Sequence, residues 1–132
     1  MKEHTLALIK PDAIGKRYQG LIIHDILDAG FEIKAMKMLH LSVEQAKAFY
    51  KVHEGKDFYE PLVSFMTSGS IIALHLEKEN GIADYRKLMG KTDPEAADPG
   101  TLRYKYAETT RRNAVHGSDS PENAKKEIAF FF

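Results

Sequence analysis

The 132-residue chain contains no cysteine and no tryptophan. The absence of cysteine excludes thiolate catalysis, disulfide scaffolds and cysteine-type zinc sites, and it is consistent with a cytosolic protein. No apolar run approaches the roughly 18 residues that a membrane-spanning helix needs; the longest extends from Ile71 to Leu76 and includes a histidine. The N-terminus shows no pattern of a cleavable leader. We therefore expect a soluble protein in the cytoplasm.

The chain also lacks net charge, because 19 Lys and Arg balance 19 Asp and Glu. A dedicated nucleic-acid binder needs a basic surface, since phosphate contacts supply much of its affinity. A neutral chain is a poor candidate for that function, so any recognition of phosphate has to be local. Apolar residues make up 43% of the chain, which suits one core at this length. We expect a single domain over residues 1–132.

Hydrophobic periodicity predicts strands at residues 5–9, 31–41, 71–76 and 113–117. The second strand alternates apolar and polar residues and should be half-buried, whereas the third is continuously apolar and should be central. Helices are predicted at 20–29, 42–52, 57–69, 80–89 and from 120 onward. Their N-terminal signals are Ser42 with Gln45, Asp57 with Glu60, Asn80, and Ser120 before Pro121.

The order of these elements contains too few strands for a doubly wound sheet. It predicts an α+β fold of the ferredoxin-like split βαβ type, in which helices cover a four-stranded antiparallel sheet. One extra helix is inserted after the second strand. Residues 90–103 contain two prolines and two glycines without a periodic pattern, which predicts a long surface loop of the kind that often carries function.

The most informative segment is residues 112–121, which read Arg-Asn-Ala-Val-His-Gly-Ser-Asp-Ser-Pro. His116 ends a predicted strand and precedes small polar residues that enter a helix, so its imidazole is exposed beside a helix N-terminus, where anions bind. Asn113, Ser118 and Glu127 could all lie nearby. Nothing groups around the other histidines, which we interpret as hydrogen-bonded structural residues: His4, His24, His40, His53 and His75.

The pattern Asn-x-x-His-Gly-Ser-Asp-Ser at residues 113–120 resembles the active-site signature of the nucleoside diphosphate kinases. Four further matches occur in the right order: Ile-Lys-Pro-Asp at 9–12, Phe-Met-Thr-Ser-Gly at 65–69, Arg86 followed by Met-Gly-x-Thr ending at Thr92, and Pro-Gly-Thr-Leu-Arg at 99–103. The resemblance implies a kinase that moves the γ-phosphate of a nucleoside triphosphate to His116 and then to a nucleoside diphosphate, by a ping-pong mechanism.

The resemblance also implies the roles of individual residues. Glu127, supported by Ser118, would fix the tautomer and orientation of His116. Tyr50 would lie beside the phosphorylated histidine as part of the catalytic group, and Phe58 would stack on the base without reading its edges, which predicts broad base specificity. The phosphates and ribose would be bound by Lys10, Arg86, Thr92, Arg103 and Asn113. Magnesium is expected on the nucleotide phosphates, with no protein ligand.

Other interpretations stay open at this stage. Tyr50 and Phe58 could be core aromatics, and the cations could be ordinary surface groups. Departures from the family pattern occur at Tyr104, Lys105, Asp57-Phe58-Tyr59, and at Thr110, which replaces an apolar wall of the base slot. The main alternative function is a catalytically silent nucleotide-binding regulatory module of the same fold.

The assembly is expected to be a homo-oligomer built from dimers, as a tetramer or hexamer. Three consecutive aromatics, Phe130 to Phe132, end the chain and cannot all face one core from a helix that turns about 100° per residue. The resemblance adds that family members pair through a sheet edge and the first helix.

Overall fold

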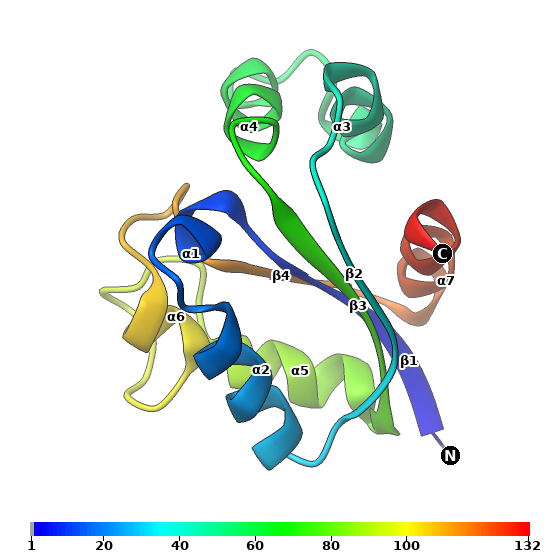
Figure 1. Cartoon of the computed structure of the whole chain (residues 1–132), viewed down its shortest axis with the longest axis vertical. Helices are drawn as coiled ribbons and strands as arrows, with labels where there is room; N and C mark the ends of the chain where they lie inside the picture. Colours follow the sequence, from blue (N-terminus) through cyan, green and yellow to red (C-terminus); the bar gives the residue numbers. More distant parts are fainter. Residues whose placement is uncertain (1) are drawn as a thin grey trace.

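The computed structural model describes residues 2–132. Its centre is a four-stranded sheet in the order β2-β3-β1-β4, and every neighbouring pair is antiparallel (Figure 1). The strands are β1 (Lys2–Ile9), β2 (Glu32–Leu39), β3 (Ile71–Glu79) and β4 (Val115–Gly117). This topology confirms the predicted fold class.

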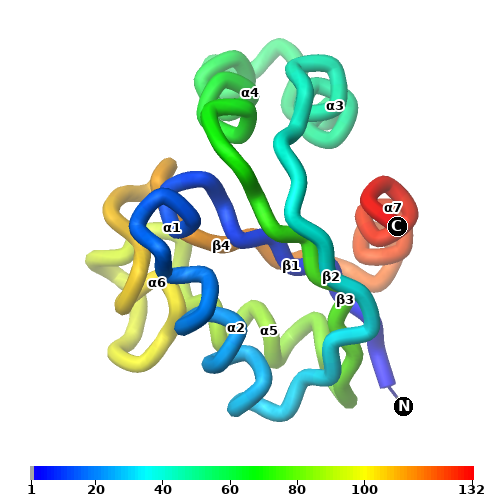
Figure 2. The backbone as a smooth tube through the Cα atoms, in the orientation of Figure 1, coloured from blue at the N-terminus to red at the C-terminus, as the bar shows by residue number. Residues whose placement is uncertain are grey.

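Helices cover both faces of the sheet, and the tube in Figure 2 shows the same arrangement. They are α1 (Pro11–Gly15), α2 (Gln19–Asp28), α3 (Val43–Phe49), α4 (Tyr59–Met66), α5 (Gly81–Met89), α6 (Leu102–Tyr106) and α7 (Pro121–Phe131), with a 3-10 turn at Lys51–His53. Helices α2 and α5 pack on one face, and α3, α4 and α7 pack on the other. None of the helices described is long and apolar enough to cross a membrane.

Strand β1 lies between the two cores and contributes to both. Ala7 and Ile9 pack into the core on the α2 and α5 face, whereas Leu6 and Leu8 pack into the core on the α7 face. Strand β3 is buried on both faces in the same way, which confirms the prediction for residues 71–76. Strand β2 is an outer strand and is more exposed than the predicted half-burial: none of its residues is fully buried, and Met36 and Met38 are more than half exposed. Its register shifts between Ile33 and Ala35.

Two of the predicted helix caps are present. Ser42 and Gln45 form a reciprocal capping box, with bonds of 3.1 Å and 2.9 Å. The Ser120 hydroxyl accepts a hydrogen bond of 3.1 Å from the Asn123 backbone N–H. This second cap fixes the residue at which α7 begins, and therefore the position of every later residue along that helix.

The two other caps were predicted wrongly. Helix α4 begins after Phe58 without a side-chain cap from Asp57. Asn80 precedes α5 in the left-handed conformation (φ 55°) and makes no capping bond with its side chain; instead, Glu3 Oε1 accepts the Ile82 N–H at 3.2 Å. Glu3 lies 79 residues from Ile82, so no local pattern could indicate it.

Two short helices were not predicted. Helix α1 follows Lys10 directly, where the sequence indicated only a turn at Pro11, because a proline also suits the first position of a helix. Helix α6 begins inside the predicted 90–103 loop, where Thr101 accepts the Tyr104 N–H. Both helices have five residues, which is too short for a periodic pattern.

Gly117 permits a close approach between β4 and α5. A Cβ at this position would lie 2.5 Å from the Tyr85 ring and 2.8 Å from the end of Met89, and Tyr85 is fully buried. The residue after His116 must therefore be glycine for the sheet and α5 to pack as they do.

We expect Gly117→Ala to lower the free energy of unfolding by about 1–3 kcal/mol, because the buried ring has to move. Gly20→Ala is the matched control: no atom lies within 4 Å of its added Cβ, and alanine favours the helix by roughly 0.5–1 kcal/mol. Urea unfolding measures both. Equal stability of the two variants would contradict this account of the packing.

Candidate active site

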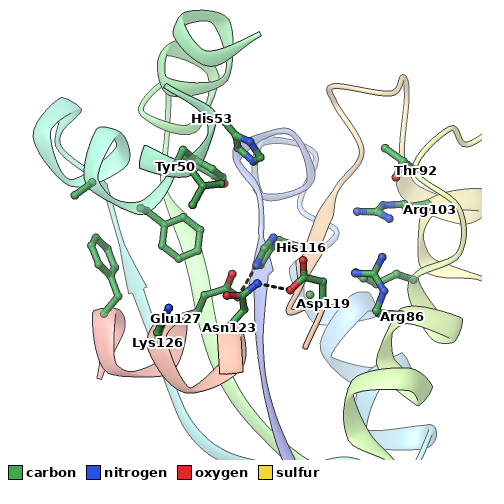
Figure 3. Close-up of a pocket in the computed structure, with 16 residues that line it drawn as sticks. Tyr50, His53, Arg86, Thr92, Arg103, His116, Asp119, Asn123, Lys126 and Glu127 are labelled. Carbon is green, nitrogen blue, oxygen red and sulfur yellow. Dashed lines mark hydrogen bonds and ion pairs between the residues drawn. The ribbon is translucent and has the colours of Figure 1, made fainter. Parts of the chain in front are cut away.

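Two adjoining cavities, of about 500 Å³ and 550 Å³, share a wall made by Tyr50, His53, Thr92 and His116. The first also contains Arg86, Arg103 and Glu127 (Figure 3), and we call it the phosphate-side cavity because the resemblance assigns the phosphates to these two arginines. The second also contains Lys10, Phe58 and Asn113, and we call it the base-side cavity because the resemblance assigns the base to Phe58. Ser118 is buried beneath them. The fold therefore brings all ten predicted site residues to one region.

His116 is held in place by a chain of hydrogen bonds. Strand β4 pairs His116 with Leu8 of β1, and the imidazole Nε2 lies 2.9 Å from Glu127 Oε1. The Ser118 hydroxyl donates to the same oxygen at 2.8 Å and accepts the Leu6 backbone N–H at 3.1 Å. His116 of β4 and Ser118 thus meet at one carboxylate oxygen of α7, and Ser118 connects that oxygen to β1.

The tautomer of His116 follows from these contacts. An ionised carboxylate only accepts hydrogen bonds, so the proton of a neutral imidazole lies on Nε2 and the lone pair lies on Nδ1. The Phe49 ring packs edge-on against the imidazole, with centroids 5.7 Å apart, and limits its rotation. These contacts hold the imidazole with its Nδ1 lone pair unused, which is the state that a histidine nucleophile requires.

Lys10 and Asn113 both line the base-side cavity and are bonded to each other. Lys10 is buried, and its Nζ donates to Asn113 Oδ1 at 2.9 Å. Burial is the main reason that the pKa of Lys10 falls to about 8; the charge of Arg103 lowers it further, and Asp12 partly opposes this. The ammonium group of Lys10 therefore loses its proton more readily than that of an exposed lysine, and a bound anion would stabilise the charged form.

Asp12 is a structural residue of the site that the sequence did not identify. Its Oδ2 accepts the Ala114 N–H at 3.0 Å, and Ala114 has a positive φ of 72°. Its burial raises the pKa of the Asp12 carboxyl. Strain at a non-glycine residue persists only where surrounding contacts hold it, and here Asp12 holds the backbone between Asn113 and β4.

Two arginines, Arg86 and Arg103, line the phosphate-side cavity. Arg103 donates to the backbone carbonyls of Gly90 (3.1 Å) and Val115 (3.0 Å), so it connects the 90–101 loop to β4. Its burial lowers its pKa. Figure 3 shows Arg86, Thr92 and Arg103 on one side of His116 and Glu127 on the other. Two cations and a hydroxyl thus surround the space next to the imidazole.

The two aromatic residues also differ. Tyr50 belongs to the core on the α7 face, yet it lines both cavities, and its buried hydroxyl has no partner among the described residues. Burial raises the pKa of this phenol, and the charge of Glu127 raises it further. Phe58 is 42% exposed and belongs to neither core, so its interpretation as a core aromatic is wrong.

His53 corrects the sequence analysis, which treated it as structural. It lines both cavities, and its ring centroid lies 5.0 Å from that of Phe58. Its Nδ1 is buried without a partner among the described residues, and burial, followed by the charge of Lys56, lowers its pKa. His53 ends a 3-10 turn, where no periodic pattern indicates which way a side chain points.

The comparisons with known proteins agree on one family. The family model described as nucleoside diphosphate kinase matches residues 3–132. A nucleoside diphosphate kinase of Histophilus somni (strain 2336) is 55% identical over 130 residues, which are 98% of this chain and 92% of the relative. One of Psychromonas ingrahamii is also 55% identical over 130 residues, covering 98% and 90%.

Two solved structures are similar over nearly the whole chain. An orthorhombic crystal form of the Aquifex aeolicus nucleoside diphosphate kinase has a TM-score of 0.98 and 41% identity, covering 100% of this chain and 96% of that one. The apo, cubic-form enzyme of Encephalitozoon cuniculi has a TM-score of 0.94 and 35% identity, covering 98% and 88%. Sequence and structure together show that this chain belongs to the nucleoside diphosphate kinase family.

Proposed function

We propose that this protein, acting as a nucleoside diphosphate kinase, transfers the γ-phosphate through a phosphohistidine on His116. The observation that carries the proposal is the bonded series Leu6, Ser118, Glu127 and His116, which leaves Nδ1 of the imidazole available beside two arginines. We further propose that residues 1–132 form one such domain and that it works in the cytoplasm, as is usual for the family.

In the first half-reaction, His116 Nδ1 attacks the γ-phosphorus of the triphosphate. The bond from phosphorus to the bridging oxygen breaks, and the nucleoside diphosphate leaves with that electron pair. Glu127 accepts the Nε2–H throughout and stabilises the positive charge that develops on the ring. In the second half-reaction, an oxygen of another diphosphate attacks the phosphorus, and the P–N bond breaks to restore the Nδ1 lone pair.

The nucleotide would lie across both cavities. The base stacks on Phe58, the ribose hydroxyls meet Lys10 and Asn113, and the phosphates extend past Thr92 to Arg86 and Arg103. Tyr50 lies beside His116, and its unpaired hydroxyl is a donor for a bound phosphate. Stacking reads no base edge, which supports broad specificity.

Magnesium would arrive on the nucleotide phosphates and neutralise part of their charge. No cluster of three His, Asp or Glu side chains suited to a metal occurs in residues 2–132. A silent regulatory module is a weaker proposal, because binding alone requires neither the oriented imidazole nor the Glu127 and Ser118 contacts behind it.

The direct test is intact mass after incubation with ATP and magnesium. We expect the mass of one phosphoryl group to be gained, to be labile in acid, and to be lost when a nucleoside diphosphate is added. His116→Ala should gain nothing, and His24→Ala, an exposed histidine outside both cavities, should behave as wild type. A gain that persists in His116→Ala would rule out this mechanism.

The lowered pKa of Lys10 predicts that nucleotide binding depends on pH. Only the charged ammonium donates three hydrogen bonds, and it predominates below the pKa of about 8. The dissociation constant for ADP should therefore rise about tenfold between pH 7 and pH 9, as the protonated fraction falls. Titration calorimetry measures this rise.

The control for this prediction is Lys10→Met. It should bind ADP more weakly at pH 7 and show a flat profile over the same range, because no group that titrates there remains in the contact. A wild-type dissociation constant that stays constant from pH 7 to pH 9 would contradict the role given to Lys10.

We also propose that the protein assembles from dimers that pair through β2 and α2. Strand β2 is an outer strand, and an open edge invites pairing with another chain. Beside it, four large apolar side chains are at least half exposed: Leu21, Leu27, Met36 and Met38. Exposed apolar clusters mark interaction surfaces, and a second copy presents the same edge and the same cluster.

Light scattering at micromolar concentration should give a mass of four or six chains. Met38→Asp should reduce that mass, because it places a charge in the contact, whereas Val43→Asp, at an equally exposed valine of α3, should not. A persistent mass of one chain would exclude any oligomer, and a mass of two would exclude only the larger assemblies.

A further inference from the structure

Arg111 lies in the site but has no role in the mechanism proposed above. It lines the base-side cavity together with Phe58, Leu62 and Thr110, but it does not line the phosphate-side cavity that contains Arg86. It is exposed, and its guanidinium makes no hydrogen bond or ion pair with another residue of 2–132. A free cation is therefore present at the base end of the site.

The neighbouring Arg112, unlike Arg111, contacts other side chains. Arg112 Nε donates to Glu108 Oε2 at 2.9 Å, and its guanidinium lies 5.6 Å from the Phe65 ring centroid. It lines a separate small cavity near Asp12. The Arg112 side chain is thus engaged by Glu108 and Phe65, whereas no such contact constrains the Arg111 side chain.

The backbone of this loop is well fixed. The Glu108 N–H donates to the Arg112 carbonyl at 2.8 Å, the Arg112 N–H donates to Thr109 Oγ1 at 3.0 Å, and Asn113 Nδ2 donates to the Thr110 carbonyl at 2.9 Å. These bonds close a turn with Thr110 and Arg111 near its tip. Only the side chain of Arg111 has to move for it to contact a ligand.

The walls of the base-side cavity are unlike each other. Phe58 and Leu62 at the start of α4 make an apolar wall. The loop between α6 and β4, which contacts α4 through Arg112 and Phe65, supplies Thr110 and Arg111. Thr110 is small and polar and covers little of a base. Of the planar side chains that this loop supplies to the cavity, the Asn113 amide is already bonded to Lys10 and to the Thr110 carbonyl, so Arg111 is the one available to a ligand.

Resting on the nucleotide position proposed above, we propose that Arg111 stacks on the face of the base that Phe58 leaves uncovered. A guanidinium is planar and weakly hydrated, and it stacks on aromatic faces. Every base has such a face, so the contact raises affinity for all nucleotides without selecting among them. We expect the base and not the phosphates to be its ligand, because Arg111 does not line the phosphate-side cavity.

The test compares Arg111→Ala, Arg111→Lys and Arg112→Ala with the wild type by titration calorimetry. The ligands are the magnesium complexes of ADP, GDP and CDP, and inorganic tripolyphosphate, which has phosphates but no base. We expect Arg111→Ala to raise the dissociation constants of the three nucleotides about three- to tenfold and to leave that of tripolyphosphate unchanged. Arg111→Lys, which keeps the charge but loses the plane, should match Arg111→Ala, and Arg112→Ala should match the wild type.

Four results would overturn the proposal. Unchanged nucleotide affinity in Arg111→Ala would mean that there is no contact, and a loss confined to GDP would mean recognition of the base edge. Weaker tripolyphosphate binding, restored by Arg111→Lys, would mean a phosphate contact. An equal loss in Arg112→Ala would mean a general effect of the loop. Phosphorylation of His116 in the wild type tests the proposed function separately: if it occurs while Arg111→Ala binds nucleotides as the wild type does, this inference fails and the proposed function stands.

Discussion

One carboxylate oxygen, Glu127 Oε1, determines how this site is built. It accepts the Nε2–H of His116 at 2.9 Å and the hydroxyl of Ser118 at 2.8 Å, and Ser118 is bonded in turn to the backbone of β1. The central strand, the edge strand and the last helix therefore have to pack correctly before the imidazole is oriented. Two further features position the same groups. The Ser120 cap fixes where α7, which carries Glu127, begins, and the absence of a side chain at Gly117 lets β4, which carries His116, pack closely against α5.

A chain with no net charge still concentrates positive charge at this site. Lys10, Arg86 and Arg103 come from the end of β1, from α5 and from α6, and burial makes the charged form of Lys10 costly. Arg103 has two of its nitrogens bonded to backbone carbonyls, so it positions the long loop as well as facing the cavity. Binding an anionic ligand relieves the mutual repulsion of these cations, which is a reason for the site to favour phosphates.

The sequence predicted the four strands and the main helices because their signals are local and periodic. Strand β3 is continuously apolar at residues 71–74. Ser42 and Gln45 lie within four residues of each other and together indicate where a helix begins. The errors have two causes: in some places a distant group decides the outcome, and in others the element is too short to show a pattern. Glu3 caps α5 from the other end of the chain, and α1 and α6 are too short to show a period. His116 was identified from its motif, but His53 was missed, since only the packing of the turn at 51–53 directs its ring into the cavities.

If Glu127 fixes the proton on Nε2 and leaves Nδ1 to react, the position of the phosphoryl group on the ring will show it. Phosphorus and nitrogen NMR of the phosphorylated protein, with histidine labelled in both ring nitrogens, distinguishes the two positions. We expect a phosphoryl group on Nδ1 of His116, with Nε2 still protonated and bonded to Glu127. A phosphoryl group on Nε2 would contradict it, because the Glu127 contact would then have to break before the reaction could occur.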